Sequence, residues 1–157
     1  MTSLQPLLSL LGQSERERDA LRVECQRAAA AQQTAEAQAD QLLAYRRDYE
    51  QRWATQFRSD GRMELVNCYR GFMERLSQAV QQQQQCAAQA DARLEQVRVA
   101  LRDSETRAAS VRKLIERRVN EARVHTERRE QKASDEFAAR SAWNAQAAAA
   151  HARLEPM

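Results

Sequence analysis

The side chains that most often carry chemistry are few and widely separated in this 157-residue sequence. His125 and His151 have no cysteine or pair of carboxylates near them at the spacing of metal ligands. Cys25, Cys68 and Cys86 form no close pair, which is typical of a reducing compartment and not of a disulfide framework. The scattered cysteines are best interpreted as small residues of a helix seam. We therefore predict no metal site and no catalytic histidine.

Phosphate-binding and dinucleotide-binding loops are also excluded, because both need closely spaced glycines. The only three glycines are Gly12, Gly61 and Gly71. A thin helical rod would also lack the concave pocket in which substrates and cofactors bind. The chain is therefore predicted not to be an enzyme and to bind no cofactor.

The elements that must position any functional residue are helices. Three glycines and two prolines are too few for the turns of a sheet or barrel. A net charge of +3 is too small to predict disorder or nucleic-acid binding. No apolar run approaches the length of a membrane span, and the leucine cluster at residues 4–11 lacks the basic leader of a signal peptide.

One break divides the helical pattern, at Ser59, Asp60 and Gly61. Gly61 is suited to the left-handed conformation that ends a helix, and the other two are turn and cap residues. We expect a first helix over about 4–57, a turn over about 58–62 and a second helix over about 63–150. A short connection makes neighbouring helices antiparallel. The prediction is an all-α single domain over 1–157, a long antiparallel two-helix coiled-coil hairpin with unequal arms.

Each predicted helix carries a seam of residues at alternating steps of three and four. The second seam is mostly apolar and consists of Val66, Tyr69, Met73, Leu76, Val80, Gln83, Ala87, Ala90, Leu94, Val97, Leu101, Ser104, Ala108, Val111, Ile115, Arg118, Ala122 and His125. The first seam is weaker and rich in alanine, so its register is open by one residue. It consists of Leu7, Leu11, Ser14, Arg18, Leu21, Cys25, Ala28, Gln32, Ala35, Ala39, Leu42, Arg46, Tyr49 and Trp53.

A hairpin centred on Asp60 and Gly61 pairs residues whose numbers sum to about 121. Four such pairs form a ladder near the turn: Gln38 with Gln83, Leu42 with Ala79, Tyr45 with Leu76, and Tyr49 with Phe72. Two helices bury only a narrow stripe on each other, and Tyr45, Phe72 and Ala79 lie off the seams. The residues alone leave open whether this ladder is coiled-coil core or an exposed docking face.

The arms differ in length, so the chain after about residue 117 is predicted to lack a helical partner. This overhang has dense mixed charge at helical spacing. Two interpretations remain open: a solvated helix held by its own ion pairs, or a surface for a second partner. The residues proposed for that surface are Arg128, Arg129, Gln131, Lys132, Asp135, Glu136 and Phe137.

Three stretches resemble the flagellar export protein FliJ family. They are the Tyr-Arg-Arg-Asp-Tyr run at 45–49, the aromatic and aliphatic series at 69–80, and the Gln-Lys-Ala-Ser-Asp-Glu-Phe-Ala box within 130–140. Their order and spacing agree with the family over nearly the whole chain. The resemblance favours the flagellar family over the equivalent stalk protein of a virulence injectisome.

The resemblance implies a cytoplasmic coiled coil similar to the gamma subunit of rotary ATPases, associated with the inner membrane only peripherally. It implies binding to the hexameric flagellar export ATPase, to the cytoplasmic domain of the export-gate membrane protein and to export chaperones. The gate-docking stripe of the family maps onto Gln38, Leu42, Tyr45, Tyr49, Phe72, Leu76, Ala79 and Gln83, which favours the docking-face interpretation of the ladder. The family can carry His where this chain has Gln83.

Two other classes remain as alternatives. A nucleic-acid-binding basic coiled coil is disfavoured because Glu116, Glu121 and Glu127 interrupt the arginines of the overhang. A purely structural spacer would need no docking stripe at all. No nucleic-acid partner is expected.

Overall fold

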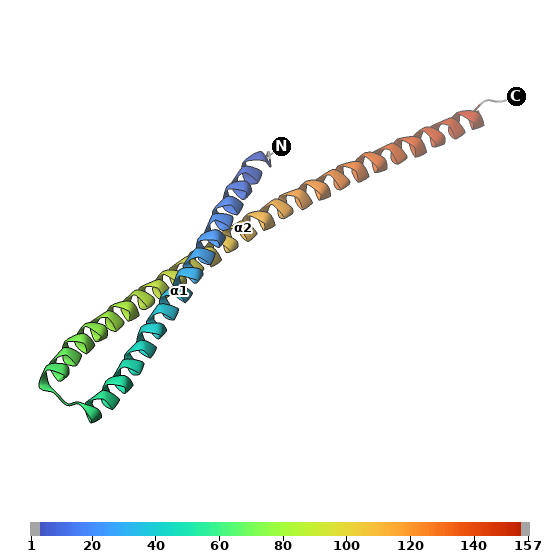
Figure 1. The fold of residues 1–157 in the computed structure, drawn as a ribbon. Helices are drawn as coiled ribbons and strands as arrows, with labels where there is room; N and C mark the ends of the chain where they lie inside the picture. Colours follow the sequence, from blue (N-terminus) through green and yellow to red (C-terminus); the bar gives the residue numbers. More distant parts are fainter. Residues whose placement is uncertain (1–3, 155–157) are drawn as a thin grey trace. The chain divides into compact units, whose positions relative to one another are not determined.

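The computed structural model describes residues 4–154, so residues 1–3 and 155–157 of the predicted domain lie outside the described range. Two helices account for nearly all of it: α1 at Gln5–Ser59 and α2 at Met63–Leu154 (Figure 1). The described residues contain no strand, which confirms the all-α prediction. Within residues 4–154 neither helix has a stretch apolar enough to cross a bilayer.

Backbone contacts divide the chain into two groups, residues 12–108 and a second group formed by the residues up to 11 and from 109 onward. Within residues 12–108, α1 and α2 run antiparallel and side by side (Figure 1). The antiparallel helical hairpin is therefore confirmed. Its ladder is also in the expected alignment, because Gln38 contacts Gln83 and Tyr49 contacts Phe72.

The two seams are the least exposed faces of their helices. Every predicted position from Val66 to Ile115 on α2, and from Leu7 to Trp53 on α1, is buried or half-buried. The register chosen for the first helix is thus correct. The buried residues are small on α1 and mostly branched aliphatic on α2: Ser14, Ala39, Leu76, Val80, Leu94, Val97, Ser104 and Ala108.

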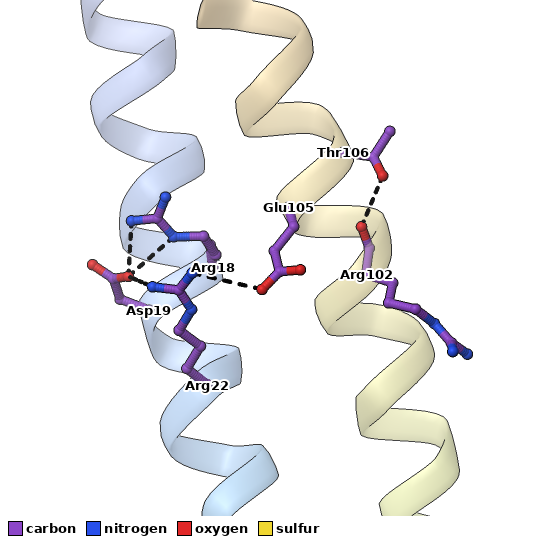
Figure 2. Close-up of polar contacts among 6 residues, drawn as sticks. All are labelled: Arg18, Asp19, Arg22, Arg102, Glu105 and Thr106. Carbon is purple, nitrogen blue, oxygen red and sulfur yellow. Dashed lines mark hydrogen bonds and ion pairs between the residues drawn. The ribbon is translucent and has the colours of Figure 1, made fainter.

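Ion pairs link the two helices along the hairpin. Arg22 reaches across to Glu105 at 3.6 Å and also contacts Asp19 on its own helix at 3.7 Å (Figure 2). Arg93 pairs in the same way with Glu24. Exposed pairs of this kind contribute at most about 1 kcal/mol each. The hairpin therefore depends on seam packing, and the ion pairs add to its alignment.

The turn consists of Asp60, Gly61 and Arg62. The Asp60 amide donates to the Gln56 carbonyl at 2.8 Å, and the Ser59 hydroxyl donates to the same carbonyl at 2.9 Å. The expected left-handed conformation of Gly61 is wrong, because none of the described residues has a positive φ. These two hydrogen bonds to the Gln56 carbonyl close the last turn of α1, so no left-handed residue is needed to end the helix.

In the second group, α2 continues without interruption from residue 109 to Leu154. Val111 and Ile115 are half-buried, and from 116 to 154 every side chain except Val124 is exposed. The last three positions of the predicted seam, Arg118, Ala122 and His125, thus have no packing role. Local pairs stabilise this part of the helix instead, including Arg123 with Glu127 at 3.9 Å.

Candidate protein-docking face

The eight ladder residues, here called the docking stripe, lie on both helices of the hairpin near the turn. They differ widely in exposure. Gln38, Tyr45 and Ala79 are exposed; the half-buried members are Leu42, Tyr49, Phe72 and Gln83. Leu76 is only 7% exposed and packs in the seam. The stripe therefore has a packed base at Leu76 and an exposed edge formed by Gln38, Tyr45 and Ala79.

Three aromatic rings connect the base of the stripe to its edge. The Tyr49 ring lies 4.8 Å from the Phe72 ring on the opposite helix, measured between centroids. The Tyr45 ring lies 4.6 Å from that of Tyr49, and Tyr45 is 44% exposed. Tyr49 and Phe72 thus hold the helices together and support Tyr45 from below. An aromatic ring supported in this way loses little conformational entropy when a partner covers it.

The two tyrosine hydroxyls are also connected. A hydrogen bond with Tyr49 raises the pKa of Tyr45 above its ordinary value, and partial desolvation acts in the same direction. Arg52 opposes this shift by favouring the tyrosinate form. Tyr45 is therefore a neutral hydrogen-bonding group at physiological pH.

Gln83 joins α2 to α1 by hydrogen bonds. Its amide nitrogen donates to the Ala35 carbonyl at 3.3 Å and to the Gln38 side-chain oxygen at 3.1 Å. A polar residue at a seam position fixes the register of a coiled coil. Gln83 therefore has a structural role that does not depend on the imidazole the family can carry there.

An open groove of about 560 Å³ lies at the edge of the stripe. Four of its lining residues belong to the stripe, namely Gln38, Leu42, Tyr45 and Gln83, and the fifth is Gln41. Sequence reasoning missed Gln41. The available signal was its spacing, because it lies three residues after Gln38 and four before Tyr45, on the same face of the helix.

A second aromatic cluster lies next to the turn. Trp53, Phe57 and Tyr69 are within 5.3–5.4 Å of one another between ring centroids. All three are half-buried. They close the end of the hairpin with mutual ring contacts.

The seven residues predicted for the overhang surface are all exposed, and they share one uninterrupted part of α2. The Gln131 amide donates to the Asp135 carboxylate at 3.1 Å. Phe137 is 74% exposed. The Phe137 ring therefore lies largely open to solvent.

The residues first considered for chemistry are dispersed. Cys25 is half-buried on the seam, whereas Cys68 and Cys86 are exposed and off it, so the seam interpretation fails for those two. Over residues 4–154 no group of three or more metal-binding side chains occurs. The arrangement that stands out is the exposed Tyr45 ring beside the groove of the docking stripe.

Comparison with known families decides the identity of the chain. Residues 3–147 match the family model described as Flagellar FliJ protein. The chain belongs to the FliJ family. No curated protein and no solved structure gave a significant match. Because the match spans both helices and the turn, the FliJ resemblance in the sequence is confirmed, and the chain is a component of flagellar type III protein export.

Proposed function

We propose that this FliJ-family chain is a non-enzymatic stalk that binds two partners of the flagellar export apparatus. One partner is the export ATPase hexamer, and the other is the cytoplasmic domain of the export-gate membrane protein. Through them it promotes ATPase assembly, couples the ATPase to proton-driven export and takes part in the escort of export chaperones. It acts in the cytoplasm and reaches the inner membrane through its partners.

The main support for gate binding is the aromatic edge of the docking stripe. Tyr45 is supported by Tyr49 and Phe72, yet 44% of it faces solvent beside an open groove. Supported aromatic side chains at a groove are the usual hot spots of protein interfaces. A structural spacer would have no reason to leave this ring open.

Titration of the full chain with the gate domain tests this proposal. Tyr45→Ala or Phe72→Ala should weaken binding by about 2 kcal/mol, which is about thirtyfold in Kd. Phe137→Ala, which removes an exposed ring outside the stripe, is the matched control and should leave the affinity unchanged. Circular dichroism should show intact helicity in all three variants. Equal affinity of wild type and both stripe variants would remove the stripe from the proposal.

The exposed part of α2 supports ATPase binding. A chain ending after residue 120 should keep the hairpin and lose its stimulation of the export ATPase. A chain ending after residue 145 keeps all seven overhang residues and serves as the control, with stimulation expected to persist. Full stimulation by the shorter chain would contradict the overhang assignment.

A further inference from the structure

The groove beside Tyr45 has an unusual chemical lining. Leu42 and the Tyr45 ring supply apolar surface, and three side-chain amides, those of Gln38, Gln41 and Gln83, supply polar groups. None of the lining residues is an acid or a base that is charged at neutral pH. Its volume of about 560 Å³ falls within the range of clefts that bind small molecules or side chains.

Hydrogen bonds within the hairpin occupy two of the three amides. Gln83 uses its nitrogen on Ala35 and Gln38, and Gln38 uses its oxygen to accept from Gln83. The side chain of Gln41 has no hydrogen-bond partner among residues 4–154 and is exposed. Gln41 is thus the one amide of the groove whose donor and acceptor both face solvent.

A free carboxamide in the same groove as apolar side chains matches a specific kind of partner surface. The amide can donate to a peptide carbonyl and accept from a peptide N–H at the same time. The floor accommodates an apolar side chain of the same segment. A charged side chain would lose its hydration there without gaining a counter-charge, at a cost of several kcal/mol.

We propose that Gln41 is a further docking residue and that the groove binds an uncharged segment of the gate domain. An apolar side chain of that segment lies against Leu42 and Tyr45, and its backbone amide pairs with Gln41. This inference rests on the proposed gate binding and adds to it a contact outside the eight stripe residues. It also specifies that recognition at this point is electrically neutral.

The test compares glutamine-to-glutamate changes at two exposed positions of α1. Gln41→Glu places a charge in the groove, and Gln26→Glu places the same charge at an exposed residue outside this groove. Glutamate and glutamine have nearly equal helix propensity, so the fold should be preserved. Titration with the gate domain should show at least about tenfold weaker binding for Gln41→Glu, because a carboxylate is buried without a partner. Gln26→Glu should remain within about twofold of wild type, as expected of a surface substitution.

Two further measurements complete the test. Gln41→Ala should weaken binding by about three- to tenfold, the effect of one lost hydrogen bond. Raising the salt concentration from about 50 mM to about 500 mM should change the wild-type Kd by less than about threefold, because screening acts on charges.

Several outcomes would overturn the inference. Equal affinities of Gln41→Glu and Gln26→Glu, with wild-type binding intact, would exclude Gln41 while leaving the proposed gate binding in place. Tighter binding by Gln41→Glu that weakens again at high salt would mean that the segment in the groove is positively charged. A Gln41-dependent self-association in sedimentation would make a second copy of the chain the occupant. Absence of wild-type binding would remove the proposed gate binding together with the inference.

Discussion

Residues 12–108 form two helices joined by a turn, residues 116–154 form one continuous helix, and the two regions are stabilised by different interactions. In the first region each helix has a face of buried or half-buried residues at seam spacing. In the second region, Val124 is half-buried and all other residues are exposed. Local pairs such as Gln131 with Asp135 recur along this part of the helix. The comparison teaches that apolar periodicity, and not helix propensity, determines where this chain packs.

The largest expected effect is on the free energy of unfolding, compared between one substitution in each region. Leu94→Ala removes a buried seam side chain and should lower the free energy of unfolding by about 2–4 kcal/mol. Val119→Ala, at an exposed residue of the second region, should change this free energy by no more than about 0.5 kcal/mol. Urea denaturation of the full chain measures both. Equal losses would mean that the regions do not differ in packing.

Glycine and alanine exchanges give a smaller effect in each region. Gly71→Ala should raise the free energy of unfolding by about 0.5–1 kcal/mol. The added methyl group meets only the end of Arg75, at 3.9 Å, so no clash offsets the gain. Ala139→Gly should reduce mean helicity in circular dichroism without changing the urea midpoint of the hairpin. A shift of the midpoint by Ala139→Gly would contradict the separate behaviour of the two regions.

The smallest effect concerns the tyrosine pair of the hairpin. Folding raises the pKa of Tyr45 through its hydrogen bond with Tyr49, so the stabilisation is complete below the ordinary tyrosine pKa of about 10. It is lost as the pH rises through the raised value in the folded chain. Tyr49→Phe should therefore lower the pKa of Tyr45, as measured by ultraviolet titration of tyrosinate. Tyr69→Phe is the control, and an unchanged Tyr45 titration in both variants would contradict the assignment.

Much of the fold could be predicted from spacing. The apolar steps from Val66 to Ile115 fixed the α2 seam, and the sum of paired residue numbers placed Tyr49 beside Phe72. The apolar steps did not mark the end of the packing, because Ala122 and His125 continue them at exposed positions. The unequal arm lengths placed that end at about residue 117, close to the half-buried Ile115. Periodicity indicates which face of a helix is apolar, and it does not indicate whether another helix packs against that face.

The candidate site was less accessible to sequence reasoning. Gln83 is a seam residue by spacing, but its bonds to Ala35 and Gln38 depend on side-chain torsions that the pattern does not specify. Gln41 was missed because glutamine is common in this chain, so its residue type did not distinguish it from other surface positions. The prediction for Gly61 was wrong because it relied on the general preference of glycine for the left-handed conformation. In this turn the Asp60 amide donates to the Gln56 carbonyl, and no residue needs a positive φ.

The small side chains of the α1 seam have a mechanical consequence. Ala28 and Ala35 are seven residues apart, so sliding one helix along the other by a heptad would replace one methyl group by another at little energetic cost. The Tyr49–Phe72 rings and the Gln83 amide oppose such slippage, since neither has an equivalent one heptad away. The register of the hairpin is therefore held most specifically near its turn, and farther along the helices the ion pairs of Arg22 with Glu105 and of Arg93 with Glu24 oppose slippage only weakly.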